Sequence, residues 1–372
     1  MEKEWHACRR ILCIRPDNIG DLLMSTPAIK ALKQTFDCHI TVLVSSMGAA
    51  VAPEIPEIDE VIVCDVPWVQ TNGVTHPAQF TELADRLKKE AFDAAVIFTV
   101  YSQNPMPSIL LAYLAEIPLR LAYCRENPYH LLTHWIPDEE PYTYIRHQVV
   151  RDLNLVARVG AVVKESRFSL QVREDLWPIV LHKLQLLGLQ PDQPWAILHP
   201  EVSEQKRKYA MADWVKAGRE IVAQGECQLL ITGKCNEVEA SAMRHEIGGH
   251  TFSAAGVFNL QELIVLIRHC SLLISVNTGT IHIASAVQTP VLVLYALTNP
   301  QHTPWNVTSE VLYFDVPESM QSKNEVVRYV YQSFARQELP LATPGRIAER
   351  ALYMLERSCA ISGSFQQPHT LP

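Results

Sequence analysis

The stretch L-L-I-S-V-N-T-G-T-I-H-I-A, residues 272–284, decides the fold. Its first five residues form an apolar run typical of a strand buried on both faces, and from residue 281 the apolar residues have helical spacing. Asn277 to Thr280 form a turn between them. A buried strand that turns directly into a helix is the repeating step of a doubly wound α/β domain, which binds ligands at the carboxyl ends of its strands.

This turn permits two interpretations. It points backbone N–H groups and the hydroxyls of Thr278 and Thr280 toward the carboxyl end of the strand, where they could donate hydrogen bonds to a phosphate. The same residues also fit a helix cap, with Thr278 or Thr280 as the N-cap residue. Gly279 is the single glycine of the turn, and neither a G-x-G-x-x-G nor a Walker sequence occurs in the chain. The turn by itself leaves both interpretations open.

Outward from this turn, apolar runs and amphipathic stretches alternate through the whole chain. The alternation predicts two parallel sheets with right-handed crossovers. In the C-terminal half we expect strands at 195–198, 227–231, 272–276 and 291–295, and helices at 177–187, 212–223, 237–247, 260–269 and 281–287. In the N-terminal half we expect strands at 11–14, 39–44, 61–66 and 94–100, helices at 80–90 and 144–159, and a helix that begins at Thr26-Pro27 after a first turn at 21–25.

The length of 372 residues predicts two domains, because one hydrophobic core rarely organises so long a chain. The prolines between 160 and 194 indicate a junction near 165–175. We therefore predict two doubly wound, Rossmann-like α/β domains that face a central cleft, an N-terminal domain over 1–168 and a C-terminal domain over 169–343. A last helix over 344–358 and a flexible tail over 359–372 follow them.

Composition excludes several classes of protein. The formal net charge of -8 argues against a nucleic-acid partner, which would need a surplus of Lys and Arg. No apolar run reaches the ~18 residues of a membrane span, and the first ten residues lack the apolar region of a signal peptide, so we expect a cytoplasmic protein. The nine cysteines contain no C-x-x-C pair, and we interpret them as small buried hydrophobes rather than a metal or disulfide framework.

A candidate base follows the first strand. Gly20 lets the chain approach a ligand, and the carboxylate of Asp21 projects toward the predicted crevice, where it could take a proton from an acceptor hydroxyl. An aspartate in a first helical turn also stabilises N–H groups that lack partners, and the helix dipole there weakens it as a base. Both roles stay open on local chemistry.

Charged residues follow two strands of the C-terminal half. Lys206, Arg207 and Lys208 could neutralise a diphosphate leaving group, or could form a solvated basic loop. Thr232-Gly233 forms another strand-to-helix turn, followed by Glu237 and Glu239. These glutamates fit either the binding of ribose or sugar hydroxyls or the stabilisation of a helix start.

An ordered set of these motifs resembles the family 9 glycosyltransferases, the lipopolysaccharide heptosyltransferase family. The resemblance covers about residues 10 to 310, and the stretch from Leu294 to Trp305 is similar to one branch of the family. Its motifs are Ile14-Arg15 through Gly20-Asp21, Thr26-Pro27-Ala28, Leu198-His199-Pro200, Thr232-Gly233, and 277–284 with Pro290.

The resemblance implies a GT-B architecture and an inverting, metal-independent transfer of a heptose-like sugar. ADP-heptose is the expected nucleotide-diphosphate donor, and a lipopolysaccharide-core or related glycan is the expected acceptor. No cofactor besides this nucleotide-sugar co-substrate is implied. A lipid-linked acceptor would bring the protein into peripheral contact with the inner membrane, for which Arg120, Arg125, Arg146 and Arg151 are candidates.

The resemblance also assigns roles to residues. Asp21 matches the general base, with Arg15 and Gly20 on the acceptor side. One cation among Lys206, Arg207 and Lys208 matches the lysine that binds the leaving phosphates. Glu237 matches the ribose-binding glutamate, with Glu239 as a shifted alternative. The remaining donor-binding matches are Asn277, Thr278, Gly279, Thr280, His282, Thr232 and Gly233.

Three departures from the family pattern keep alternatives open. Asn277 stands where the family usually has Asp, Tyr209 replaces a Trp, and the stretch 316–320 lacks the cysteines common in that branch. A non-catalytic nucleotide-sugar or glycan-binding relative, or a family 9 transferase with another donor, would also fit. A nicotinamide-dependent oxidoreductase fits the sheet pattern but lacks the glycine fingerprint after the first strand.

Overall fold

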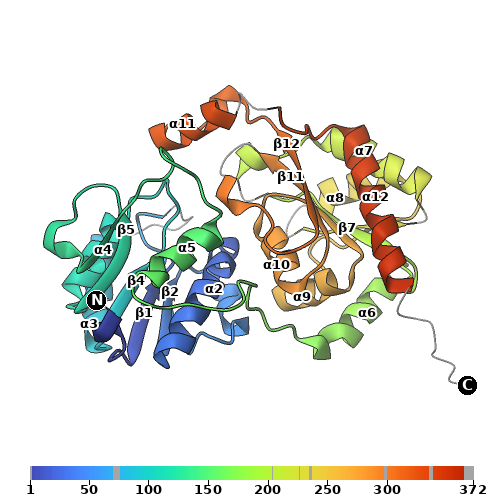
Figure 1. Ribbon diagram of the computed structural model, residues 1–372. Coiled ribbons are helices and arrows are strands. Elements are labelled where there is room, and N and C mark those ends of the chain that lie inside the picture. Colours follow the sequence, from blue (N-terminus) through green and yellow to red (C-terminus); the bar gives the residue numbers. More distant parts are fainter. Residues whose placement is uncertain are drawn as a thin grey trace, which may run out of the picture. The chain divides into compact units, whose positions relative to one another are not determined.

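The computed structural model describes residues 2–69, 76–202, 204–225, 227–233, 237–296, 300–334 and 338–363. The chain forms two compact units (Figure 1). The N-terminal unit contains Met1–Gln171 together with Pro300–His302, and the C-terminal unit contains Val172–Asn299 and Thr303–Pro372. The division therefore falls between Gln171 and Val172, where the sequence pattern predicted it between 168 and 169.

Each unit is built on a six-stranded sheet in which all neighbouring strands are parallel. The N-terminal sheet contains, in sheet order, β3 (Glu60–Val63), β2 (His39–Val44), β1 (Arg10–Ile14), β4 (Ala94–Ile97), β5 (Leu119–Cys124) and β6 (His134–Pro137). The C-terminal sheet contains, in sheet order, β12 (Ser309–Phe314), β11 (Val291–Ala296), β10 (Leu272–Val276), β7 (Trp195–His199), β8 (Gln228–Ile231) and β9 (Thr251–Ser253).

The two sheets share one topology. Numbered within its own unit, each has the strand order 3-2-1-4-5-6 of a doubly wound Rossmann fold. Ligands of such sheets bind outside the carboxyl ends of the two strands at which the order reverses. These switch points lie between β1 and β4 in the N-terminal unit, and between β7 and β10 in the C-terminal unit.

Helices cover both faces of the N-terminal sheet. The helices α3 (Pro77–Lys89) and α4 (Met106–Leu114) pack on one face, where Leu87 and Ile109 join a buried cluster with strand residues such as Leu12. The helices α2 (Ile19–Phe36) and α5 (Gln148–Ala157) pack against each other. A short α1 (Glu2–Trp5) precedes the sheet, and its Trp5 ring contacts the ring of Phe36.

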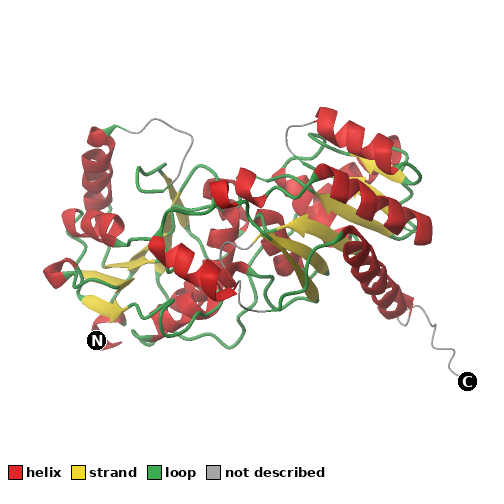
Figure 2. Cartoon of the chain, turned by 90° about the horizontal axis from the view of Figure 1, so that it is seen from above, coloured by secondary structure: helices red, strands yellow, loops and turns green. Residues whose placement is uncertain are grey.

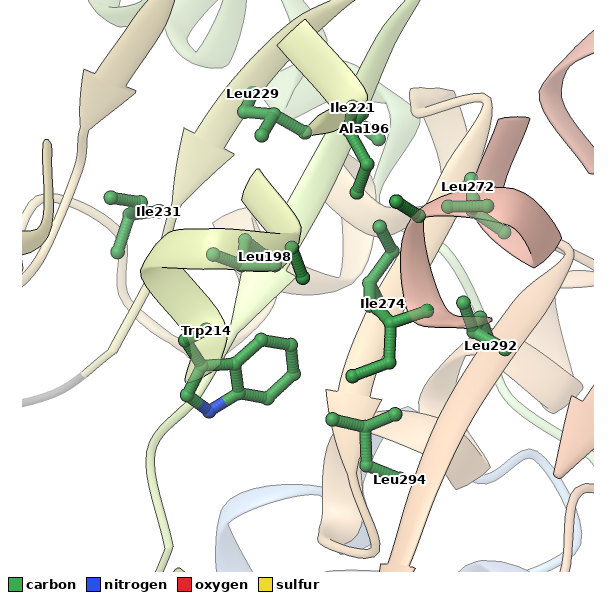
Figure 3. Close-up of a cluster of buried hydrophobic side chains, with 14 of the residues drawn as sticks. Ala196, Leu198, Trp214, Ile221, Leu229, Ile231, Leu272, Ile274, Leu292 and Leu294 are labelled. Atoms are coloured by element: carbon green, nitrogen blue, oxygen red, sulfur yellow. The ribbon is translucent and has the colours of Figure 1, made fainter. Parts of the chain in front are cut away.

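The C-terminal sheet has the same layers. One buried cluster receives side chains from three helices: α7 (Met211–Gln224), α8 (Glu237–Ile247) and α12 (Pro344–Gly363). In a second group, α9 (Leu260–His269) contacts both α6 (Trp177–Leu186) and α10 (Gly279–Val287). Figure 3 shows Trp214 of α7 beside Leu198 and Ile274 of the sheet. A further helix, α11, spans Glu325–Phe334.

The first long helix begins earlier than the sequence pattern predicted. The helix α2 starts at Ile19, with Asn18 as its N-cap residue, and continues through Pro27, so the prediction of a start at Thr26-Pro27 is wrong. Pro27 has no N–H for the carbonyl of Leu23, which would normally receive one. The hydroxyl of Thr26 donates to this carbonyl instead (2.7 Å), which explains how the helix tolerates an internal proline.

We expect Thr26→Val to lower the free energy of unfolding by about 2 kcal/mol. The Thr26 hydroxyl also accepts a hydrogen bond from the N–H of Ser169 (3.0 Å), so valine leaves two buried backbone groups without a partner. Urea denaturation of the two variants Thr26→Val and Thr26→Ser tests this, because serine keeps the hydroxyl. Equal stability of both variants would contradict the role given to the hydroxyl.

The C-terminal end also differs from the prediction. The helix α12 extends to Gly363, so residues 359–363 are helical and do not belong to a tail (Figure 2). Residues 364–372 of the predicted tail lie outside the described residues. The predicted helix at 144–159 is shorter and begins at Gln148.

The cysteines that can be placed in the cores behave as apolar residues. Cys13 lies in β1 and Cys270 is the C-cap residue of α9, and both are buried. Burial raises the pKa of both thiols well above the usual value. Buried thiols of this kind are inert, which agrees with the structural role expected for them.

Candidate functional site

The turn after β10 lies at the switch point of the C-terminal sheet. Ser275 Oγ donates to the carbonyl of His199 (3.2 Å), which joins the ends of β10 and β7. Asn277 is buried, and its Oδ1 accepts a hydrogen bond from the N–H of Ala296 at the end of β11 (3.2 Å). Because a carboxylate could accept the same bond, the replacement of the family's Asp by Asn preserves this contact.

The helix after the turn presents its N-terminus to this switch point. Thr278 occupies the N-cap position of α10, but within the described residues its side chain makes no cap hydrogen bond. Thr278 Oγ1 instead lies 2.9 Å from Thr280 Oγ1, which in turn lies 3.1 Å from Ser275 Oγ. The partial positive charge of the helix end is therefore not offset by a cap, which favours the anion-binding interpretation over a simple capped helix.

The three successive cations are not equivalent. Arg207 Nη1 donates to the carbonyl of Asn277 (3.2 Å), and its Nε is buried without a hydrogen-bond partner among the described residues. Lys206 and Arg207 both form ion pairs with Glu204 (2.5 Å and 3.1 Å), and Lys208 forms one with Glu239 (3.3 Å), but among the described residues Arg207 has the contact with the turn. Arg207 is therefore the cation that the structure brings to the turn.

The basic loop is anchored at its end by Tyr209, the residue that replaces a Trp of the family. The Tyr209 hydroxyl donates to the carbonyl of Ala342 (2.6 Å), and its ring packs edge-on against Trp214 (5.4 Å between centroids). Tyr209 is buried. Tyr209 therefore anchors the chain to the core two residues after the 3₁₀ turn Gln205–Arg207.

The turn after β8 also reaches this region. Thr232 Oγ1 lies 2.9 Å from Nδ1 of His199, and burial lowers the pKa of His199 to about 4, so this imidazole is neutral at pH 7. Gly233 approaches Glu201 so closely that an added Cβ would lie 2.7 Å from a carboxylate oxygen. Thr232 and Gly233 thus pack against the end of β7 and shape the switch point.

Glu237, the predicted ribose ligand, begins α8 and lines a cavity of about 900 Å³. The other residues of this cavity include Arg244, His245 and Thr251, and none belongs to the 277–280 turn or the basic loop. Glu239, the shifted alternative, forms the ion pair with Lys208. The remaining predicted donor residue, His282, is buried in the first turn of α10.

Asp21 stabilises the start of α2, and its side chain is partly exposed. It lies in the first turn of α2, directly after the buried Gly20, and the N–H of Asn18 donates to its Oδ2 (3.3 Å), which stabilises the helix start. Its other oxygen, Oδ1, accepts a hydrogen bond from Nη2 of Arg15 (3.2 Å). The side chain of Asp21 is 14% exposed, whereas Arg15 is fully buried. Oδ2 therefore stabilises the helix start, whereas Oδ1 is the oxygen that faces Arg15 and to which the interpretation as a base applies.

Arg15 is shared between two carboxylates. Its Nε lies 3.5 Å from Asp17 Oδ2, and its Nη1 has no hydrogen-bond partner among the described residues. Burial raises the pKa of Asp17 to about 6, although Arg15 acts in the opposite direction. Arg15 therefore offsets only part of the effect of burial on Asp17.

A second buried carboxylate, Asp152, links α2 to α5. Its Oδ2 accepts from Ser25 Oγ (2.7 Å) and its Oδ1 accepts from Gln148 Nε2 (2.7 Å). Burial raises the pKa of Asp152 to about 6. Between about pH 4 and pH 6, Asp152 is therefore protonated in the folded chain and ionised in the unfolded chain. Because the folded chain binds more protons, the contribution of Asp152 to the free energy of unfolding decreases as the pH rises.

We expect Asp152→Asn to become more stable relative to the wild type as the pH rises from 4 to 7. The amide does not ionise, so the difference in free energy of unfolding should change by up to about 3 kcal/mol in favour of the variant. Chemical denaturation of both proteins at several pH values measures this difference. A difference that stays constant across the range would contradict the ionisation of a buried Asp152.

Sequence reasoning assigned no role to Gln301 and His302, which the structure places beside Asp21 in the N-terminal unit. His302 Nε2 lies 3.8 Å from Asp21 Oδ1. Gln301 is fully buried, and its Nε2 donates to Glu140 Oε1 (3.3 Å). Both residues lie in the stretch that resembles one branch of the family, and this resemblance was the available signal.

The arginines predicted to contact a membrane have internal partners. Arg151 is buried and pairs with Asp138 (2.8 Å) and Glu140 (2.6 Å), while Arg120 and Arg125 donate to main-chain carbonyls. The guanidinium of Arg146 lies 4.1 Å from the centre of the Tyr144 ring. Arg120 and Arg151 are therefore structural, and that prediction is wrong for them. None of the helices in the described ranges is both long and apolar enough for a membrane crossing.

Comparison with known proteins identifies the family. The family described as "Glycosyltransferase family 9 (heptosyltransferase)" matches residues 80–329. The "Lipopolysaccharide heptosyltransferase 2" of Salmonella typhimurium is 22% identical over 315 residues, which cover 79% of this chain and 85% of that protein.

Two solved structures share the fold. A glycosyl transferase family 9 protein from Veillonella parvula has a TM-score of 0.72 and 16% identity, covering 94% of this chain and 97% of its own. The ADP-heptose lps heptosyltransferase II of E. coli has a TM-score of 0.68 and 19% identity, covering 94% and 99%. Both likenesses agree with two Rossmann-like units. The chain therefore belongs to glycosyltransferase family 9, the heptosyltransferase family, and is a glycosyl-transferring enzyme with a GT-B fold.

Proposed function

We propose that this enzyme transfers a heptose from ADP-heptose to a lipopolysaccharide-core or related glycan acceptor. The transfer inverts the anomeric centre and requires no metal. Asp21 acts as the general base, and the turn Asn277 to Thr280 holds the donor diphosphate with Arg207. The contact of Arg207 with the Asn277 carbonyl, at the N-terminus of α10, is the observation that carries this proposal.

The donor side supplies positive charge to the leaving group. As the bond between the sugar and the diphosphate breaks, negative charge grows on the departing phosphate and the sugar gains oxocarbenium character. The N-terminus of α10 and the guanidinium of Arg207 lie at the same switch point and are fixed before the reaction. Charges fixed in this way stabilise a developing anion without reorganisation at the moment of reaction.

The acceptor side supplies the base. Asp21 Oδ1 is oriented by Arg15, and the carboxylate is partly exposed at the first turn of α2. An acceptor hydroxyl gives its proton to this carboxylate while its oxygen forms the new bond to the sugar. Arg15 and Gly20 are the acceptor-side residues of this step.

The names of the relatives support the donor and acceptor. A relative of 22% identity is a lipopolysaccharide heptosyltransferase, and the structure from E. coli is described as an ADP-heptose enzyme. Asn277 keeps the hydrogen bond to Ala296, which favours an intact donor site. Because the proposed acceptor is lipid-linked, we place the reaction in the cytoplasm, at the face of the inner membrane.

A donor panel tests this function. The full chain is incubated with ADP-heptose, ADP-glucose, UDP-glucose or GDP-mannose and a lipid-linked core acceptor, and nucleotide release and the mass of the acceptor are measured. We expect release of ADP from ADP-heptose and an acceptor heavier by one heptose. Failure of all nucleotide sugars to turn over would contradict the proposal.

The same panel separates a non-catalytic relative from an enzyme with another donor. Calorimetric binding of ADP-heptose without turnover on any acceptor would indicate a nucleotide-sugar-binding protein that has lost activity. Turnover of a different nucleotide sugar would keep the mechanism and replace the donor. We expect neither outcome, because the contacts of Asp21 with Arg15, of Arg207 with Asn277 and of Asn277 with Ala296 support the proposed site.

A further inference from the structure

The chain between β11 and β12 enters the N-terminal unit for a short distance. The 3₁₀ turn η6 (Pro300–His302) belongs to the N-terminal unit, although the strands on both sides of it belong to the C-terminal unit. Both flanks are attached near the donor-side turn. The N–H of Ala296 donates to Asn277 Oδ1 (3.2 Å), and the N–H of Trp305 donates to Ser285 Oγ on α10 (3.3 Å).

Gln301 fixes this short turn in place. Its side chain is fully buried, donates to Glu140 Oε1 (3.3 Å) and accepts a hydrogen bond from the N–H of Tyr101 (3.4 Å). Glu140 is itself held by the buried Arg151 (2.6 Å). A buried amide with contacts at both ends, one of them to an ion-paired carboxylate, gives the next residue a defined position.

That next residue, His302, faces the proposed base. Its Nε2 lies 3.8 Å from Asp21 Oδ1, the same oxygen that receives Nη2 of Arg15, and its side chain is 20% exposed. Among the described residues, Arg15 and Asp17 of the β1–α2 connection lie around this oxygen, and Glu140 and Arg151 lie around the neighbouring Gln301. Arg15 is shared between Asp17 and Asp21, and in the part of the chain that the structure describes the ring of His302 adds a further group of potential positive charge near Asp21.

We propose that His302 is a positioning residue for Asp21. Its ring Nε2 restrains Oδ1, and its positive charge helps to keep the carboxylate ionised until it accepts the proton of the acceptor hydroxyl. Asp21 is then the group that receives the proton, and the electron pair of the broken sugar–phosphate bond leaves with the diphosphate. The inference rests on the proposed function, in which Asp21 is the base.

Kinetics of His302→Ala and His302→Gln test this role. We expect His302→Ala to lower kcat about tenfold, to leave the donor KM within twofold, and to move the acid limb of the kcat–pH profile up by about half a unit to one unit. Glutamine can donate an N–H to the same oxygen, so His302→Gln should recover most of kcat. His130→Ala serves as the control, because this histidine is exposed in the N-terminal unit.

A double substitution distinguishes positioning from a structural role. In the Asp21→Asn background, His302→Ala should cause no further loss of kcat. If His302 were needed only for folding, its replacement would lower kcat both in the wild type and in Asp21→Asn. A kcat within twofold of the wild type with an unchanged pH profile would overturn the proposal. So would a loss of equal size in the Asp21→Asn background.

A measurement without turnover keeps this inference separate from the proposed function. In protein labelled with ¹⁵N-histidine, the protonation midpoint of the His302 ring should fall by about half a unit or more when Asp21 becomes asparagine. An unchanged midpoint overturns the inference even if the enzyme is active. A lowered midpoint in a protein that turns over none of the donors supports the inference while the proposed function fails.

Discussion

Replacing Asp21 by asparagine is expected to lower kcat by about 10²- to 10⁴-fold. The amide cannot take the proton of the acceptor hydroxyl, yet it has the same shape, and its oxygen can still accept the hydrogen bond from the N–H of Asn18. Donor binding should therefore change little, because the proposed donor residues belong to the C-terminal unit. Steady-state kinetics with ADP-heptose and calorimetry with ADP measure the two quantities.

The control for Asp21→Asn is its thermal unfolding. Helix α2 keeps its N-cap residue and the internal contact of Thr26, so the melting temperature should stay close to that of the wild type. A variant that folds and binds ADP but retains more than one tenth of kcat would remove Asp21 from the role of base. Asp17, which shares Arg15, would then be the next carboxylate to test.

Arg207→Ala should lower kcat by about 10²-fold, since it removes one fixed positive group from the departing phosphate. The kcat of Arg207→Lys should lie between those of the wild type and Arg207→Ala. Lysine keeps the positive charge but cannot reproduce the several fixed N–H groups of the guanidinium. The donor KM should rise less than kcat falls, because charge on the leaving oxygen grows mainly in the transition state. Steady-state kinetics across a range of ADP-heptose concentrations separates the two effects.

The chain supplies matched controls for Arg207. Lys208 is exposed and paired with Glu239, and Lys206 shares Glu204 with Arg207. Because it is Arg207 that donates to the carbonyl of Asn277, alanine at either lysine should change kcat less than threefold. A larger loss of kcat in Lys208→Ala than in Arg207→Ala would show that the basic loop changes its conformation when the donor binds. The assignment of Arg207 to the diphosphate would then be wrong.

The alternation of strands and helices was predictable because the central strands are buried on both faces. Such strands appear as continuous apolar runs, as in 272–276 and 291–295, which match β10 and β11 within one residue. Four strands escaped prediction. In β5 the charged Arg120 interrupts an otherwise apolar segment, whereas β6, β9 and β12 each form an edge of its sheet. Their residues are only partly buried, so no apolar run distinguishes them from loops.

The start of α2 could not be predicted from local signals. Thr26-Pro27 has the composition of a helix N-terminus, and only the contact of the Thr26 hydroxyl with the Leu23 carbonyl makes Pro27 acceptable inside a helix. The turn at 277–280 was correctly located between a strand and a helix. The local contact of the Thr278 hydroxyl with the Thr280 hydroxyl, which in the described part of the chain takes the place of a cap hydrogen bond, favours the anion-binding interpretation.

The individual roles within the site needed the folded chain. Three adjacent cations look alike in the sequence, but only tertiary structure brings Arg207 to the carbonyl of Asn277. His302 is remote from Asp21 in the sequence, and its place beside the carboxylate depends on η6 joining the N-terminal unit. Proximity between distant segments has no local sequence signal, which explains why motifs located the site but not these contacts.

The position of a bound nucleotide diphosphate shows which part of the C-terminal unit holds the donor. A crystal structure of the full chain with ADP should place oxygens of the diphosphate about 2.7–3.2 Å from the N–H groups of Gly279 and Thr280 and from the guanidinium of Arg207. The site account would be contradicted by ADP bound in the cavity lined by Glu237 and Arg244 with no phosphate oxygen at the turn after β10.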